Sequence, residues 1–300
     1  MSARSEWLVE ASTVNYLKTI AQDARGIARV CGWWVALRWL WCILLTSPEC
    51  LKARNLQPAD RRMGRGPFGV VRQRARAKLA GQQVFSGIRE IWVRDVYLKD
   101  NYLEIPPRGL VIDLGANMGN FTNLALAQHD DVRVIAVEPS RSLSNAIRES
   151  LSINGWSNRA SIKRAFVGVK TEVQIRVASD PDYRETQYIS EAAFLEEFDI
   201  RRVDFLKCDI EGSEFFLTEP GSRLLSLTKN LAIEVHPTGG SVKDFLSFLG
   251  AAGFEIGSVV EDRSGACIAL CRRPSAQMAG VAGLDNPVWL GGPGEGQPSH

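Results

Sequence analysis

A strand followed by a glycine-containing turn, at residues 111–120, is the first segment of this sequence whose residue types could bind a ligand. It reads Val-Ile-Asp-Leu-Gly-Ala-Asn-Met-Gly-Asn, so Gly115 and Gly119 lie four positions apart. Without a β-carbon, a glycine lets the backbone turn sharply and approach a ligand. Glu138 follows Gly119 by nineteen positions, at the end of the next predicted strand, where a carboxylate can accept hydrogen bonds from both hydroxyls of a ribose. The pattern therefore predicts a nucleoside-binding site.

The charge of Asp113 indicates which nucleoside cofactor this site would bind. A carboxylate two residues before the first glycine would repel a pyrophosphate, but it would attract the methionyl ammonium of S-adenosylmethionine, directly or through water. Asn117 also takes the place of the central glycine in the dinucleotide pattern Gly-x-Gly-x-x-Gly. Both differences predict S-adenosylmethionine in preference to NAD. The residues predicted to bind it are Asp113, Gly115, Ala116, Asn117, Gly119, Asn120, Glu138 and Pro139.

A second group of charged residues lies at the ends of two later predicted strands. Lys207, Asp209 and Glu211 occupy alternate positions, and Glu234 and His236 repeat this spacing further along the chain. Charged side chains are costly in a parallel strand that is buried on both faces, unless they lie at its carboxyl end, where ligands bind in α/β folds. We therefore predict that these five residues form the catalytic site.

Two routes to an activated acceptor hydroxyl follow from this group. In the first, His236 or Asp209 accepts the hydroxyl proton, while Lys207 orients a carboxylate or the substrate. In the second, the side chains of Asp209, Glu211, Glu234 and His236 hold a divalent metal that lowers the pKa of the hydroxyl. Because no tight ligand spacing in the sequence demands a metal, the first route is preferred.

Short apolar runs alternate with helical patterns from residue 110 onward. Strands are predicted at 110–114, 132–137, 162–167, 173–177, 203–209 and 231–236. Helices are predicted at 120–127 and 142–154, between the last two of these strands with an interruption at Pro220, and after a capping box that begins at Ser241. Two more strands, at 254–260 and 266–272, flank a turn. The order predicts an α/β fold, in which helices cover both faces of a mostly parallel sheet that ends in an antiparallel hairpin.

Four motifs, in this order, resemble the FkbM family of class I methyltransferases. They are Val-Ile-Asp-Leu-Gly-Ala-Asn-Met-Gly (111–119), Val-Glu-Pro-Ser (137–140), Asp-Phe-Leu-Lys-Cys-Asp-Ile-Glu-Gly-Ser-Glu (204–214) and Ile-Glu-Val-His (233–236). The resemblance extends over residues 84–272, with Cys208 where an aliphatic residue is more usual. It implies a seven-stranded Rossmann-like fold and methyl transfer from S-adenosylmethionine to a hydroxyl of a sugar, polyketide or other small metabolite. The alternatives are an NAD-dependent oxidoreductase and a non-catalytic relative that binds S-adenosylmethionine.

A tryptophan-rich amphipathic helix is predicted before this region. Apolar residues recur every three or four positions from Leu17 to Leu44, and residues 33–45 are apolar on almost every side except at Arg38. A helix of this length spans about 20 Å, short of the roughly 30 Å hydrocarbon core of a bilayer. Two roles remain open for residues 16–45: packing on the catalytic domain or on a second subunit in a homodimer, and lying in a membrane interface.

The patterns divide the chain into a helical extension with a basic linker (1–83), a methyltransferase domain (84–273) and a disordered tail (274–300). The linker holds nine Lys or Arg and one acid between Lys52 and Lys78, but the whole chain has a net charge of only +2, so no nucleic-acid partner is expected. Six cysteines without a disulfide framework, and no secretory pattern, predict a cytoplasmic protein. A membrane-interfacial helix would place it peripherally on the inner face of the membrane.

Overall fold

The computed structural model describes residues 3–99, 101–168, 170–261 and 265–274. The chain divides into two compact units, Met1–Asp95 and Val96–His300. From residue 275 onward, the predicted disordered tail lies outside the described residues. None of the helices within those described ranges combines the length and the apolar character needed to cross a membrane.

The C-terminal unit is built on a seven-stranded sheet with the strand order β10-β11-β9-β8-β3-β4-β5. The strands are β3 (Leu110–Leu114), β4 (Arg133–Val137), β5 (Ala160–Lys163), β8 (Val203–Cys208), β9 (Thr228–Val235), β10 (Glu255–Glu261) and β11 (Cys267–Arg272). Neighbouring strands from β9 to β5 are parallel. β11 pairs antiparallel with β9, and β10 pairs antiparallel with β11. The predicted Rossmann-like sheet and its C-terminal hairpin are confirmed.

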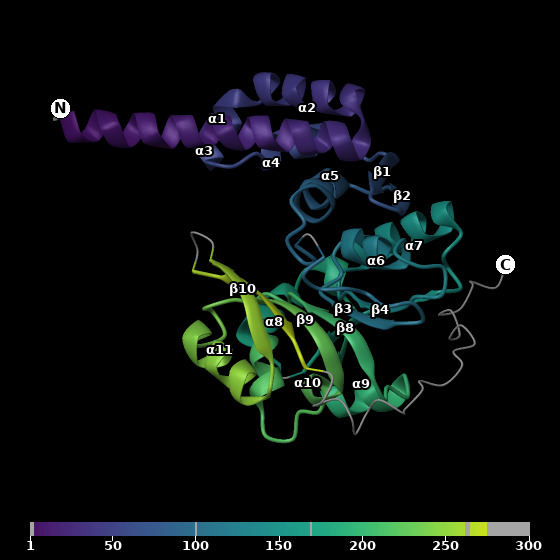
Figure 1. Ribbon diagram of the computed structural model, residues 1–300. Coiled ribbons are helices and arrows are strands. Elements are labelled where there is room, and N and C mark those ends of the chain that lie inside the picture. The colour runs from purple at the N-terminus through teal and green to yellow at the C-terminus, as the bar shows by residue number, and fades with distance from the viewer. Residues whose placement is uncertain (1–2, 100, 169, 262–264, 275–300) are drawn as a thin grey trace. The chain divides into compact units, whose positions relative to one another are not determined.

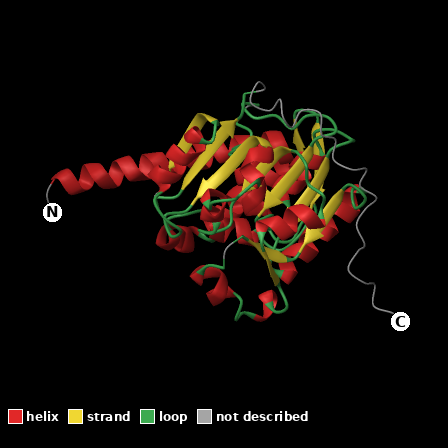
Figure 2. Ribbon diagram, turned by 90° about the horizontal axis from the view of Figure 1, so that it is seen from below, coloured by secondary structure: helices red, strands yellow, loops and turns green. Residues whose placement is uncertain are grey.

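Helices cover both faces of this sheet, as two perpendicular views show (Figures 1 and 2). α6 (Asn120–Leu126) and α7 (Arg141–Asn154) lie on one face, and α9 (Glu191–Glu197), α10 (Leu224–Leu227) and α11 (Val242–Ala251) lie on the other. The 3-10 turns η2 (Pro181–Tyr183) and η3 (Glu214–Thr218) and the short parallel pair β6 (Ala165–Val167) and β7 (Gln187–Ile189) complete the unit together with α8 (Glu172–Val177). Because parallel strands leave the same edge of the sheet, their loops meet there.

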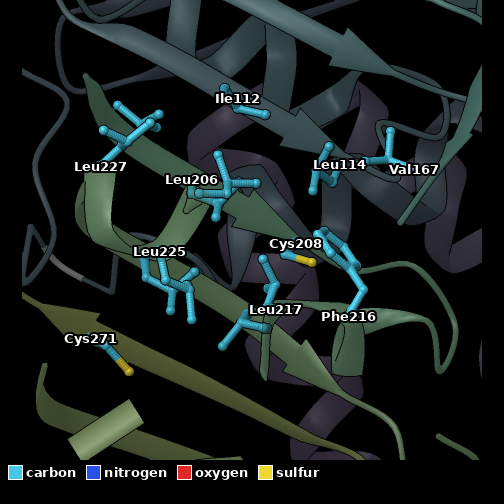
Figure 3. Close-up of a cluster of buried hydrophobic side chains, with 14 of the residues drawn as sticks. Ile112, Leu114, Val167, Leu206, Cys208, Phe216, Leu217, Leu225, Leu227 and Cys271 are labelled. Atoms are coloured by element: carbon cyan, nitrogen blue, oxygen red, sulfur yellow. The ribbon is translucent and has the colours of Figure 1, made fainter. Parts of the chain in front are cut away.

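A buried apolar cluster holds the sheet against the helices on one face (Figure 3). Ile112 and Leu114 of β3 meet Leu206 of β8, and Phe216 and Leu217 of η3 pack over them. Burying an aliphatic or aromatic side chain of this size contributes about 1.5–3 kcal/mol to folding. Cys208 lies within the same cluster, fully buried, so its thiol serves as a small apolar side chain.

Two segments differ from their predicted conformation. Residues 173–177, predicted as a strand, belong to helix α8, because Thr171 and Gln174 form a reciprocal capping box that starts the helix. The predicted strand at 162–167 is divided between β5 and β6, which pair in different sheets. At 173–177, the capping box favours a helix over the strand that the alternating apolar residues predict. At 162–167, the strand is interrupted because its two halves pair with different neighbours.

The N-terminal unit holds more structure than the predicted linker. Helix α1 (Ala3–Cys31) is followed by Gly32, whose positive φ of 93° separates it from α2 (Trp33–Leu45). The segment predicted as a connector folds into α3 (Ser47–Ala53), α4 (Gln57–Arg62) and the hairpin β1 (Phe68–Arg72) and β2 (Ala75–Leu79). It is followed by α5 (Val84–Gly87) and the π-helix η1 (Ile88–Val93).

A buried ion-pair network explains why this unit extends to Asp95 rather than to residue 83. Arg89 of η1 donates to Asp23 of α1 at 2.9 Å and to Asp60 of α4 at 2.7 Å. Arg94 also pairs with Asp23, at 2.7 Å, and Asp95 pairs with Arg72. Removing one partner of a buried pair costs about 3–5 kcal/mol, so these contacts fix the segment to the N-terminal helices.

Candidate functional site

A cavity of about 390 Å³ lies at the carboxyl ends of β3, β4 and β8. This volume is within the range of small-molecule sites. Its wall is mostly apolar, with polar groups from several separate loops. The lining residues are Leu114, Gly115, Asn117, Val137, Glu138, Pro139, Leu143, Ala165, Phe166, Val167, Gln174, Val177, Tyr183, Asp209, Ile210 and Glu211. Four residues of the predicted cofactor set, Gly115, Asn117, Glu138 and Pro139, are therefore in this wall.

Gly115 brings the turn after β3 against the end of β8. Its φ is +75°, and a β-carbon there would lie 1.8 Å from the backbone oxygen of Asp209. The amides of Gly115 and Ala116 both donate to Val137 O at 3.0 Å, which fixes the turn to β4. Only glycine fits here, because the conformation and the close approach both exclude a side chain. The turn is thus open to a ligand on its cavity side.

Asp113 is not among the residues that line the cavity. Its side chain is fully buried, accepts a hydrogen bond from Thr122 Oγ1 at 2.6 Å and lies 3.5 Å from Lys207 Nζ. Lys207 also donates to the backbone oxygen of Gly115 at 2.6 Å. Asp113 therefore balances the charge of the lysine that holds the glycine turn. Its attraction for the methionyl ammonium, directly or through water, stays a prediction. Ala116, Gly119 and Asn120 of the predicted set also lie outside the lining.

Lys207 is a buried cation that lies between two carboxylates. Its Nζ lies 3.5 Å from both Asp113 Oδ1 and Asp209 Oδ2. Burial lowers the pKa of the ammonium, but the charges of Asp209 and Asp113 outweigh burial and raise it above its ordinary value. Lys207 stays charged, and it joins the turn after β3 to the end of β8.

Glu138 is where the sequence predicts it, at the end of β4 in the cavity wall. Its Oε2 accepts from the amide of Asn117 and its Oε1 from the amide of Ser140, both at 2.8 Å. Burial raises the pKa of this carboxyl to about 7, against the lowering effect of the two backbone donors. A carboxylate held in this way has further lone pairs for the hydroxyls of a ligand.

Asp209 and Glu211 line the same cavity. Tyr97 Oη donates to Asp209 Oδ2 at 3.2 Å, and Lys207 lies near the same oxygen. Glu211 is much more exposed, with 79% of its side chain accessible. Asp209 is thus a positioned carboxylate in the wall, while Glu211 lies at its open side.

His236 is held by a glutamate that the sequence analysis did not select. Its Nδ1 lies 2.8 Å from Glu214 Oε1, which also accepts from the amides of Ile210 and Gly212. Burial alone lowers the pKa of the imidazole. The hydrogen bond to Glu214 and the charges of Glu214, Glu211 and Asp209 outweigh it and raise the pKa to about 9. At neutral pH the ring is therefore protonated, which argues against His236 as a proton acceptor.

Asp209, Glu234 and His236 come together as one cluster. Each offers one ligand atom, and these atoms lie within 4.8 Å of one another. His236 Nε2 is 3.7 Å from Glu234 Oε1 and 3.6 Å from Glu211 Oε2. The spacing meets the first requirement for a divalent cation, and the same distances suit an imidazolium surrounded by carboxylates.

Several lining residues were absent from the sequence-based set. Gln174 comes from α8, which the alternation of apolar residues had predicted as a strand, and Tyr183 comes from η2. Phe166 and Leu143 are apolar, and nothing in their spacing distinguishes a cavity wall from a core. The sequence does contain a signal for Glu214, because this residue ends the charged motif at 204–214.

Comparison with known proteins places this site in a family. Residues 113–256 match the methyltransferase FkbM domain. The match covers the glycine turn, Glu138 and the charged ends of β8 and β9, so it confirms the family that the motifs predicted. It also supports S-adenosylmethionine as the cofactor, in preference to NAD. None of the curated proteins matches the chain significantly.

Several solved structures are similar to this chain at low sequence identity. An uncharacterised protein from Listeria monocytogenes serotype 4b is 12% identical, with a TM-score of 0.38 over 57% of this chain and 64% of that chain. TrmK of M. capricolum, in complex with S-adenosyl-homocysteine, is 11% identical, with a TM-score of 0.36 over 55% and 62%. Precorrin-6y C5,15-methyltransferase from Geobacter metallireducens is 16% identical, with a TM-score of 0.40 over 61% and 88%. The chain thus spans less than two thirds of the length of the Listeria protein and of TrmK. These TM-scores carry no information about the substrate of this chain.

Proposed function

We propose that this chain, in which residues 113–256 form a methyltransferase FkbM domain, transfers a methyl group from S-adenosylmethionine to a hydroxyl oxygen of a small metabolite. One observation carries the proposal. The lining of the cavity at the carboxyl ends of the strands includes both Glu138, an acid placed to accept from ribose hydroxyls, and Asp209, a carboxylate held by Tyr97 and Lys207. Methyl transfer to a hydroxyl needs both a cofactor site and a group that receives a proton.

The lining of the cavity fits the cofactor in four respects. Glu138 can accept from ribose hydroxyls, the apolar side chains of Phe166 and Val167 suit an adenine ring, and Gly115 leaves room where a side chain would stand. Asp209 and Glu211 supply negative charge for the sulfonium and ammonium groups. When bound, S-adenosylmethionine supplies a methyl group that its sulfonium has already activated.

The ionisation of Glu138 ties cofactor affinity to pH. With a pKa of about 7, this carboxyl is mostly protonated at pH 6 and mostly ionised at pH 8. Two hydroxyl donors stabilise the ionised form, so the pKa must be lower in the complex than in the free protein. By linkage, affinity rises with pH through the free-protein pKa, by at most about tenfold per pH unit.

Asp209 is the group that the geometry favours as proton acceptor. It lines the cavity, whereas His236 is protonated at neutral pH and is not among the described lining residues. Tyr97 and Lys207 hold the carboxylate in place, so an acceptor hydroxyl seated in the cavity could donate to it. The reaction then needs only alignment of the hydroxyl oxygen with the methyl group, which the cavity walls supply.

An acceptor screen tests the proposal. The full chain is incubated with S-adenosylmethionine and a panel of hydroxyl-bearing sugars and polyketides, and the products are analysed by mass spectrometry. We expect one methyl group to be added to a hydroxylated acceptor, together with formation of S-adenosylhomocysteine. Transfer to amine acceptors, with none to hydroxyls, would contradict the O-methylation assignment. The cytoplasmic setting that we propose rests on the six cysteines, which are all free thiols.

A further inference from the structure

The helix α2 presents an apolar face to solvent within the N-terminal unit, where it runs along α1 (Figure 1). Its exposed apolar side chains are Trp33, Trp34, Leu37, Trp41, Leu44 and Leu45. At about 100° per residue they fall within an arc of about 120°. The opposite face buries Ala36, Trp39, Cys42 and Ile43 against the rest of the unit. The helix is thus apolar on both sides, and only one side has a partner within the described part of this unit.

The exposure of the tryptophans is the unusual part of this face. Trp34 is 85% exposed, Trp33 72% and Trp41 61%. Isolated exposed apolar residues are common, but a contiguous patch of this kind marks an interaction site. Tryptophan is also the side chain that concentrates at the boundary between water and lipid. The composition of the face therefore suits the interfacial zone of a bilayer.

The net positive charge of the N-terminal unit favours a bilayer that contains acidic lipids. Residues 1–95 carry sixteen Lys or Arg and seven Asp or Glu, a net charge of +9, although the whole chain has +2. Within residues 16–95, thirteen Lys or Arg are exposed but only two acids, Glu49 and Glu90. The other three acids, Asp23, Asp60 and Asp95, are buried in ion pairs. Among the side chains described in residues 16–95, exposed positive charge therefore far exceeds exposed negative charge.

From the exposed face and this charge, we infer that the N-terminal unit binds anionic lipid bilayers through α2. The helix lies in the plane of the interface with its tryptophans among the lipid headgroups, while the basic residues attract acidic lipids. With 13 residues, α2 is too short to span the hydrocarbon core. An exposed row of leucines and tryptophans does not suit nucleic acid, whose backbone is charged and hydrated.

Flotation of the full chain with vesicles tests this inference. The vesicles contain phosphatidylcholine with about one quarter phosphatidylglycerol, or phosphatidylcholine alone. We expect the protein to float with the anionic vesicles and to be released at about 0.5 M salt, where charges are screened. The Trp34→Glu/Trp41→Glu variant should lower the partition coefficient at least about tenfold, because both side chains leave the interface.

A matched variant separates loss of this surface from a general effect of added acids. Ile153→Glu/Val260→Glu places two acids at exposed apolar positions of the C-terminal unit and should float like the parent. Thermal unfolding of both variants reports whether the fold is retained. Equal flotation of the Trp34→Glu/Trp41→Glu variant, or no flotation of the parent, would overturn the inference. So would a parent that sediments as a dimer and fails to float while this variant is monomeric, since a second copy would then cover the face.

Discussion

Replacing Lys207 by methionine should lower the free energy of unfolding of the C-terminal unit by about 3–5 kcal/mol, because it leaves a buried carboxylate without its counter-charge. Asp113 is fully buried, and Lys207 is the cation that faces it, at 3.5 Å. The same change removes the donor to Gly115 O and releases the turn after β3. Hydrogen exchange of the amides in β3 and β8 measures this free energy directly, since these strands lie at the centre of the sheet.

The control for this prediction removes both charges at once. In the double variant Lys207→Met/Asp113→Asn, no buried charge remains at this position, and Thr122 can still donate to the amide oxygen. We expect the double variant to be more stable than the single one, with a coupling energy of at least about 1 kcal/mol. Equal stabilities of single and double variants would show that the pair does not hold the turn.

Replacing Asp209 by asparagine should reduce kcat by about 100-fold to 10,000-fold, the usual contribution of a positioned general base. Asparagine keeps the shape of the side chain and can still accept from Tyr97, and Lys207 keeps Asp113 as its partner. The measurement is the rate of S-adenosylhomocysteine formation with an accepted hydroxyl substrate. Glu211→Gln, a mostly exposed carboxylate in the same cavity wall, is the matched control and should change kcat much less.

Two outcomes would contradict the assignment of Asp209. The first is an Asp209→Asn enzyme that retains more than about one tenth of kcat, since a general base contributes far more than this. The second is activity that a chelator abolishes and Mg²⁺ restores. In that case Asp209, Glu234 and His236, whose ligand atoms lie within 4.8 Å of one another, would hold a cation instead.

The parts of the fold that depend on neighbouring residues could be predicted from the sequence. The apolar runs predict β3, β4, β8 and β9, and the glycine turn and Glu138, both selected from the sequence, contribute to the cavity wall. Each of these signals lies within one strand and its loop, where periodicity and backbone freedom decide the structure. The helix α8 was missed because its capping box outweighs an alternating pattern.

The parts that depend on strand order could not be predicted in the same way. β3 pairs with β8, and the register places Asp113 directly opposite Lys207. The two residues are 94 positions apart, and nothing local indicates their pairing. For the same reason the contact between His236 and Glu214, which makes the imidazole a cation, was outside the reach of sequence spacing. The predicted site residues that line the cavity are Gly115, Asn117, Glu138, Pro139, Asp209 and Glu211, and the contacts among the charged residues depend on the tertiary pairing.

Calorimetric titration of the full chain with S-adenosylhomocysteine and with NAD tests the central claim most directly. We expect binding of S-adenosylhomocysteine but not of NAD, with an affinity that rises between pH 6 and pH 8 as Glu138 ionises. Glu138→Gln should bind more weakly and lose this pH dependence, because the amide does not titrate. Binding of NAD in place of S-adenosylhomocysteine, or an affinity that is the same in the parent and in Glu138→Gln at every pH, would contradict the account.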